Sequence, residues 1–343
     1  MRFWRERTAG PHCVICLRSG ARMLLRVRFP SRVAHVAAGR RRRSCVTAAM
    51  AKVEKGVSAL ADSYDSLLLD QFGVLHDGRV AYPAAVDAVR RLAEAGKRLV
   101  ILSNSGRRAE NTIAKLEPLG FDPRWFAGAV TSGETTHQAL SLRTDPVFKA
   151  LGQRCLHLTW GDRGAINVDE HCLEHVTDPN LADFVLAHGM EAISGGSMEP
   201  AQPVTLDDIQ ALLRVAARRR LPLIIANPDV VTVDTTYLVP MPGMCGVWYE
   251  EYGGPPAILM GKPAAVIYEA AKQFCTGRVL AVGDSLAHDI AGAQGAGIDS
   301  LFIANGIHAK DLEDGPLTAA SVAKLAAAHG CAEPTYIMDA FRF

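Results

Sequence analysis

Short apolar segments that alternate with amphipathic segments are the feature that most constrains the fold of this chain. From about residue 64 the order is "SLLLD", "AAVDAVRRLAEAG", "RLVILSNS" and "ENTIAKLEPLG", and the same alternation returns near the end in "RVLAVGDS" and "DSLFIANG". In the first amphipathic segment the apolar residues recur at helical spacing, and Gly96 provides a stop. Continuous apolar strands separated by helices predict a parallel sheet covered on both faces.

The two stretches with this alternation predict one doubly wound, Rossmann-like α/β core that is built from both ends of the folded chain. Between them, from 133 to 256, the composition is looser and contains its own helix and strand candidates. Thr205 and Asp208 have the spacing of a capping box and predict a helix start. We therefore expect core segments at 51–132 and 257–343, with a second α/β domain inserted at 133–256 as a cap.

The first 50 residues differ from the rest in charge. They hold twelve Arg, no Lys and one acidic residue, for a formal charge of +11, whereas the remaining residues carry −10. This Arg-rich leader, which ends in "GRRRRSCVTAAMAK", is typical of an organellar transit peptide, with the chloroplast stroma favoured and the mitochondrion as the alternative. Further alternatives are a disordered basic tail, or a true start at Met23 or Met50, of which a start at Met50 would leave a cytoplasmic protein.

The charge of the folded part also bears on its partners. Because the globular part is acidic, we expect no nucleic acid partner. No stretch approaches the roughly 18 uninterrupted apolar residues that a membrane helix needs, so we also expect no membrane span.

Polar side chains follow several of the predicted strands at the point where each strand ends. In an open parallel sheet, ligands collect at these carboxyl ends. Any one of these residues has an ordinary explanation, such as a helix cap or a solvated lysine. Their order along the chain is what predicts a site, which would contain Asp70 after "LLL", Ser103 and Asn104 after "LVIL", Lys262 in "LMGKP", and Asp284 and Asp289 in "LAVGDSLAHD".

The spacing of these residues resembles the four motifs of the haloacid dehalogenase superfamily. The motifs are an Asp followed by Gly73, a Ser-Asn after the next strand, a Gly-Lys-Pro, and a Gly-Asp followed five residues later by another Asp. The position of the insert, between the second and third motifs, resembles the class IIA phosphatases of the N-acetylglucosamine-phosphate and phosphoglycolate phosphatase type. The resemblance spans about residues 62 to 310. It implies a Mg²⁺-dependent phosphohydrolase that acts on a small phosphorylated metabolite through an aspartyl-phosphate, and a homodimer as an option.

The resemblance also implies a role for each motif residue. Asp70 would be the nucleophile, and the ammonium of Lys262 would offset the repulsion between its carboxylate and the phosphate. The "NPD" residues would lie near the cleft between core and cap, where direct substrate contact and an ordinary loop turn both stay open. The implied groups are Asp70, Asp284, Asp289 and the backbone carbonyl of Phe72 for the metal, Ser103, Asn104 and Lys262 for phosphate, and Asn227 and Asp229 for substrate.

Phe72 departs from the family pattern. Most phosphatases of this superfamily have a second Asp there, which protonates the departing alcohol, and such general acid–base help is typically worth ~10²- to 10⁴-fold. Three outcomes follow. The protein could react only with substrates that have a good leaving group, or His76 or Asp77 could supply the proton. Alternatively, it is a phosphate-ligand-binding or phosphotransfer protein on the same fold. Because the other motif residues are all present, we favour a handicapped or substrate-restricted phosphohydrolase.

Overall fold

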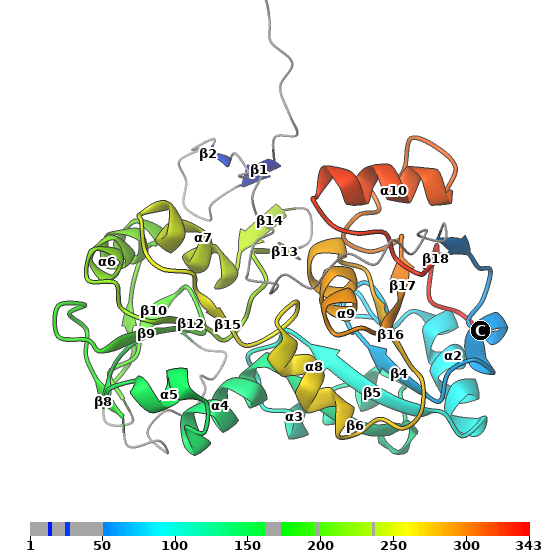
Figure 1. The fold of residues 1–343 in the computed structure, drawn as a ribbon, viewed down its shortest axis with the longest axis horizontal. Helices are drawn as coiled ribbons and strands as arrows, with labels where there is room; N and C mark the ends of the chain where they lie inside the picture. The colour runs from blue at the N-terminus through cyan, green and yellow to red at the C-terminus, as the bar shows by residue number, and fades with distance from the viewer. Residues whose placement is uncertain (1–12, 16–24, 28–50, 162–172, 197–198, 235–236) are drawn as a thin grey trace, which may run out of the picture.

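The computed structural model describes residues 13–15, 25–27, 51–161, 173–196, 199–234 and 237–343, which form two lobes (Figure 1). The predicted transit peptide, including Met23 and Met50, lies outside the described residues except for two short strands. These strands, β1 (Cys13–Ile15) and β2 (Leu25–Val27), pair with each other, and β1 also pairs with β14 of the inserted segment. No helix among the described residues has the length and apolar character needed to cross a membrane.

The core lobe is an α/β layer structure built from both ends of the chain, as predicted. Its sheet has the strand order β3-β18-β17-β16-β4-β5-β6 and all its pairs are parallel. The first part consists of β3 (Lys52–Val53), α1 (Ser58–Ala61), β4 (Ser66–Leu69), α2 (Pro83–Glu94), β5 (Arg98–Ser103), α3 (Glu110–Ala114), η1 (Glu117–Leu119), η2 (Pro123–Trp125) and β6 (Phe126–Thr131). The second part consists of α8 (Ala265–Lys272), β16 (Val279–Gly283), the π-helix η4 (Leu286–Ile290), α9 (Ala291–Gly295), β17 (Asp299–Ile303), α10 (Ala319–Ala328) and β18 (Tyr336–Met338).

Successive residues of the central strand β4 pack on opposite faces of this sheet. Leu67 and Leu69 share a buried cluster with Val89 of α2, whereas Leu68 lies in another cluster with Ile267 of α8. Because both faces are covered, every residue of β4 is buried, which explains its continuous apolar sequence. The polar residue that ends this run, Asp70, therefore emerges at the edge of the sheet.

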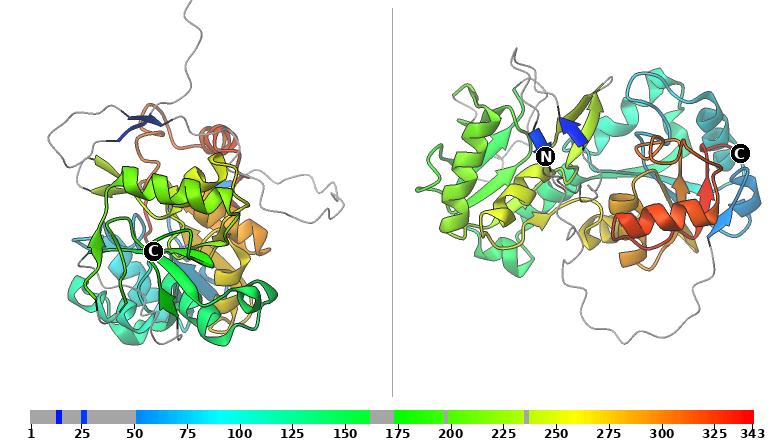
Figure 2. Two further views of the ribbon diagram at one scale, coloured as in Figure 1. Left: turned by 90° about the vertical axis from the view of Figure 1, so that its left-hand side faces the viewer. Right: turned by 90° about the horizontal axis from the view of Figure 1, so that it is seen from above.

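The inserted lobe has its own mixed sheet, with the order β11-β10-β7-β9-β12-β15 and β8 beside β7. The capping box predicted at the start of α6 is present. Seen from above, this cap and the core lie side by side, with α10 on the core (Figure 2). The elements are α4 (Ser132–Leu142), α5 (Pro146–Ala150), β7 (Arg154–Thr159), β8 (Glu174–His175), β9 (Phe184–Ala187), β10 (Ala192–Ile193), β11 (Gln202–Pro203), α6 (Leu206–Arg218), β12 (Leu223–Ile225), β13 (Val231–Asp234), β14 (Tyr237–Pro240), α7 (Gly243–Glu251) and β15 (Ile258–Leu259).

The sheet of the cap extends slightly further along the chain than the predicted boundary at 256. Strand β15 pairs in parallel with β12, with Ile224 opposite Ile258. Sequence reasoning missed this strand because two residues between a Pro-rich loop and a Gly-Lys-Pro turn give no periodic signal. The return to the core therefore takes place between Leu259 and Lys262, directly beside the third motif.

Candidate active site

Three neighbouring strands of the core bring the predicted residues to one edge of the sheet. Strand β4 lies between β16 and β5, and all three run parallel. Asp70 follows β4, Ser103 is the last residue of β5, and Asp284 follows β16. The site therefore lies at the carboxyl ends of the central strands, where open parallel sheets bind ligands.

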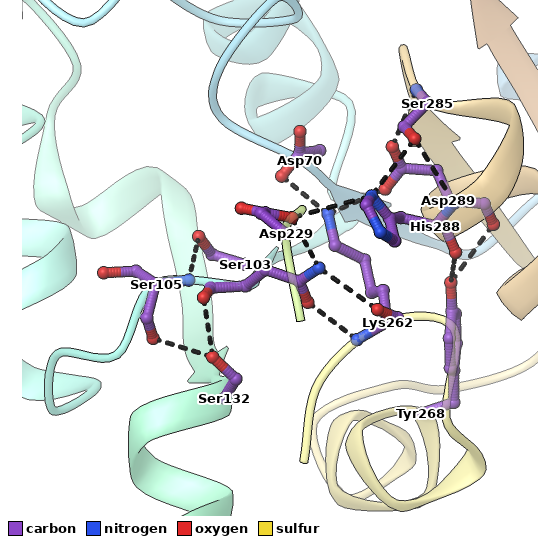
Figure 3. Close-up of polar contacts among 11 residues, drawn as sticks. Asp70, Ser103, Ser105, Ser132, Asp229, Lys262, Tyr268, Ser285, His288 and Asp289 are labelled. Carbon is purple, nitrogen blue, oxygen red and sulfur yellow. Dashed lines mark hydrogen bonds and ion pairs between the residues drawn. The ribbon is translucent and has the colours of Figure 1, made fainter. Parts of the chain in front are cut away.

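Lys262 is held between two carboxylates of this site (Figure 3). Its Nζ donates to Oδ1 of Asp70 and to Oδ1 of Asp289, each at 2.7 Å. The Lys262 side chain is only 3% exposed, and the carboxylates are 13% and 6% exposed. Burial opposes the charge on Lys262, but attraction to Asp289 and Asp70 outweighs it and holds the pKa of Lys262 above its ordinary value. The lysine is therefore a fixed positive charge beside the nucleophile.

The carboxylates of Asp70, Asp284 and Asp289 form a compact cluster. One oxygen from each lies within 4.8 Å of the other two. Burial raises the pKa of Asp70 to about 7, against the opposing effect of Lys262, and burial with the neighbouring carboxylates raises the pKa of Asp284. Three carboxylates therefore face one ammonium. A cluster of carboxylate oxygens whose negative charge is only partly balanced by one ammonium fits a hard divalent cation such as Mg²⁺.

Two glycines leave room for the carboxylate of Asp284. Its Oδ2 accepts a hydrogen bond from the backbone N–H of Ile307 at 2.7 Å. A Cβ on Gly73, whose φ is +73°, would lie 1.9 Å from this Oδ2, and a Cβ on Gly306 would lie 2.1 Å from it. The loop after the nucleophile therefore needs glycine for both its backbone angle and its approach to Asp284. None of the described residues donates a hydrogen bond to the carbonyl oxygen of Phe72, the group predicted to contact the metal.

We expect Gly73→Ala to disable the site while the fold persists. The added methyl group would displace the Asp284 carboxylate, and a shift of about 1 Å at a reacting centre can cost roughly 10²-fold in rate. Gly96→Ala is the matched control, because Gly96 has a φ of +75° but nothing within 4 Å of an added Cβ. The measurement is kcat for phosphate release alongside thermal unfolding. Equal losses of activity in both variants would show that backbone strain alone, and not contact with Asp284, explains the effect.

The side chain of Asn104 holds the backbone of Lys262. Its Oδ1 accepts from the Lys262 N–H at 2.7 Å, while its Nδ2 donates to the Lys262 carbonyl at 3.1 Å and to Oδ1 of Asp229 at 2.9 Å. Both ends of the side-chain amide are therefore bonded within the protein. The predicted contact of Asn104 with phosphate would be made by its backbone N–H. Ser103 is buried, and its Oγ accepts from the Ser105 N–H at 3.2 Å.

Asn104→Asp tests this positioning role. The substitution keeps the shape and the acceptor for the Lys262 N–H, but it removes the donor and places a carboxylate against Asp229. We expect kcat to fall by roughly 10- to 100-fold because Lys262 is no longer held in place. The control is Asn111→Asp on the exposed surface of α3, which we expect to leave kcat unchanged. Wild-type kcat in Asn104→Asp would contradict the assignment.

The "NPD" turn brings Asp229 to the site, and the side-chain oxygen of Asn227 bonds within the turn. Oδ1 of Asn227 accepts from the Asp229 N–H at 3.0 Å, which is an ordinary loop turn. Asp229 contacts Asn104 as described, and its Oδ1 lies 3.5 Å from Nδ1 of His288. Sequence reasoning missed His288 altogether. The available signal was its position in "SLAHD", directly before Asp289, on a helix that starts at a strand end.

His76 and Asp77 both have structural roles, which bears on the proton donor. His76 is buried, its Nδ1 accepts from the Gly78 N–H at 3.0 Å, and burial lowers its pKa. Oδ1 of Asp77 accepts from two backbone N–H groups at 2.8 Å, and these hydrogen bonds lower its pKa. Phe72 is 56% exposed, and its ring centroid lies 4.9 Å from that of His76. Nδ1 of His76 and Oδ1 of Asp77 therefore accept backbone N–H groups, which favours structural roles for both residues.

Comparison with known proteins places the chain in a family. The model of haloacid dehalogenase-like hydrolases matches residues 67–163, and a HAD-hydrolase-like model matches residues 259–328. Chronophin from Bos taurus is 26% identical over 259 residues, which cover 70% of this chain and 81% of chronophin.

Solved structures agree with this placement. A haloacid dehalogenase-like hydrolase from Brucella suis has a TM-score of 0.66 and 26% identity, and covers 84% of this chain and 100% of its own. Glycerol phosphate phosphatase from Mycobacterium tuberculosis in complex with calcium has a TM-score of 0.52 and 25% identity, over 72% of this chain and 68% of that one. The complex of the same phosphatase with magnesium has a TM-score of 0.54 and 24% identity, and covers 81% of this chain and 75% of that one. The chain belongs to the haloacid dehalogenase-like hydrolases, within the class IIA phosphatase group.

Proposed function

We propose that this protein is a Mg²⁺-dependent phosphohydrolase that cleaves small phosphate monoesters through an aspartyl-phosphate on Asp70, and that Phe72 restricts it to esters with good leaving groups. The observation that carries the proposal is the bridge from Nζ of Lys262 to Asp70 and Asp289 within a buried carboxylate cluster. The names of two relatives, glycerol phosphate phosphatase and phosphoglycolate phosphatase, support phosphate esters as the substrate class.

The side chains at the strand ends suit the two halves of this reaction. An oxygen of Asp70 would form a bond to phosphorus while the bond to the ester oxygen breaks, and water would then cleave the aspartyl-phosphate. The ammonium of Lys262 would lower the repulsion between Asp70 and the incoming phosphate, and Ser103 would hold a phosphate oxygen. A divalent cation held by Asp70, Asp284 and Asp289 would supply further positive charge at the same place.

Phe72 sets the expected substrate range. Its side chain can donate no proton, and the backbone contacts of His76 and Asp77 favour structural roles for both. The departing oxygen would therefore leave without help from a general acid. A phenolate or carboxylate, the leaving group of an aryl or acyl phosphate, tolerates this better than an alkoxide does. We expect aryl phosphates to be cleaved faster than alkyl phosphates.

The test is phosphate release by the full chain in Mg²⁺ and in EDTA, with an aryl phosphate and a panel of alkyl phosphates, and with Asp70→Asn as the blank. The expected result is Mg²⁺-dependent release that is fastest on the aryl ester and absent from the blank. Equal rates for aryl and alkyl esters would overturn the restriction by Phe72. No release above the blank on any ester would leave the phosphate-binding or phosphotransfer alternative, which calorimetric titration with inorganic phosphate would then examine.

A further inference from the structure

We propose that His288 is a further substrate-contacting residue, whose Nδ1 accepts a hydrogen bond from Oγ of Ser285 and whose Nε2 donates one to the leaving-group oxygen. The inference rests on the proposed function, since it concerns the leaving group of the same reaction. It assigns a hydrogen-bond donor to a part of the site where the family's usual acid is replaced by Phe72.

The contacts of His288 fix one side of its ring and leave the other open. Nδ1 lies 3.5 Å from Oδ1 of Asp229 and 3.2 Å from Oγ of Ser285. The side chain is 21% exposed, and none of the described residues hydrogen-bonds to Nε2. When Nδ1 accepts from the Ser285 hydroxyl, the ring carries its hydrogen on Nε2, and this donor is presented to a ligand.

The position of His288 is set by a one-turn π-helix. His288 lies in η4, between the Ser285 N-cap and Asp289, whose Oδ2 accepts from the Ser285 N–H at 3.0 Å. This short helix places Asp289 against Lys262 and His288 against Asp229, so one element serves the carboxylate cluster and the cap at the same time. π-Helical turns are rare and are often found at functional sites.

The direction of the reaction places the leaving group on the side of the cap. Asp70 stands at the end of β4 in the core, and displacement at phosphorus requires the attacking and departing oxygens to lie in line. The departing oxygen is therefore on the side of phosphorus away from the core sheet. His288 belongs to the core and its ring lies beside Asp229 of the cap, so the ring is on the cap side of the site (Figure 3).

The proposed step requires only a hydrogen bond from His288, because the proton comes from water. The bond from Asp70 to phosphorus forms, the bond from phosphorus to the ester oxygen breaks, and that oxygen departs with the electron pair. The Nε2–H group stabilises the growing negative charge through its hydrogen bond, and water then supplies the proton. Because this charge is larger on a poor leaving group, the hydrogen bond matters more for alkyl than for aryl esters.

The experiment measures kcat/KM of the full chain for substituted phenyl phosphates of increasing phenol pKa and for an alkyl phosphate. His288→Leu removes the donor, and His288→Gln keeps an N–H at similar reach. For the alkyl ester we expect His288→Leu to lower kcat/KM by roughly 10- to 100-fold, with less than about 3-fold change for p-nitrophenyl phosphate and partial recovery in His288→Gln. His329→Leu, at an exposed histidine at the end of α10, is the control and should match the wild type.

The outcomes separate this inference from the proposed function. A fall in His288→Leu that is the same for every ester would point to disturbance of the neighbouring Asp289 and would overturn the inference alone, as would no fall at all. A fall that steepens with the pKa of the leaving group, and that His288→Gln reduces, would establish it. Release by the wild type no faster than by Asp70→Asn would remove the proposed function and this inference together.

Discussion

Replacing Asp70 with asparagine should lower kcat for phosphate release by about 10⁴-fold or more, because the amide cannot act as the nucleophile. The substitution keeps the shape of the side chain, and the amide oxygen can still accept the hydrogen bond of Lys262. We therefore expect the variant to fold and to keep its cap in place. Phosphate release in Mg²⁺ measures the loss, and circular dichroism checks the fold.

The matched control for this prediction is Asp77→Asn in the same loop. Oδ1 of Asp77 accepts hydrogen bonds from the backbone N–H groups of Arg79 and Val80, and an asparagine oxygen can replace it in both. We expect activity within about 2-fold of the wild type, since a surface change away from the reacting atoms has little effect. If Asp77→Asn lost as much activity as Asp70→Asn, Asp77 would be a catalytic group and the assignment would be wrong.

Replacing Lys262 with methionine should reduce both stability and activity. The change leaves Asp70 and Asp289 buried without their counter-charge, and breaking a buried ion pair from one side costs about 3 to 5 kcal/mol of the free energy of unfolding. The loss of a positive charge beside the transferred phosphoryl group should lower kcat by about 10²- to 10³-fold. Urea unfolding in EDTA measures the first effect, and steady-state kinetics in Mg²⁺ measures the second.

Lys272→Met is the control for the stability part of this prediction. Lys272 makes an ion pair with Glu269 at 2.6 Å, but both side chains are largely exposed. Exposed pairs contribute about 0 to 1 kcal/mol, so this variant should unfold almost as the wild type does. Millimolar Mg²⁺ should restore part of the stability of Lys262→Met, because the cation would supply the missing charge to the carboxylates. A variant as stable as the wild type in EDTA would mean that the carboxylates are not ionised in the metal-free protein.

The parts of the site that lie at strand ends could be predicted from the sequence. Apolar runs that end in Asp70, Ser103 and Asp284 predict parallel strands, and parallel neighbours necessarily bring their ends to one edge. Lys262 and Asp289 followed from their spacing relative to these strands and from the family resemblance. The structure bears out the α/β core, the inserted α/β cap and the clustering of these side chains.

The parts that depend on contacts between distant segments could not be predicted. The side chain of Asn104 bonds to Lys262, which is 158 residues away, and no local pattern records that contact. His288 was overlooked because a histidine inside a helix candidate has no periodic signal, and its contact with Asp229 requires the cap to be folded against the core. Strand β15 is too short to be detected without its partner, β12.

The path of the chain out of the cap has a mechanical consequence. Strand β15 ends at Leu259, and the reactive Lys262 follows three residues later. The connection from the cap to the core therefore lies directly beside the ammonium of Lys262. The two hydrogen bonds between the Asn104 side chain and the backbone of Lys262 tie the lysine to the end of β5 in the core. Met260, two residues before the lysine, is packed in the cap. We therefore expect the position of the ammonium to be preserved when the cap moves relative to the core.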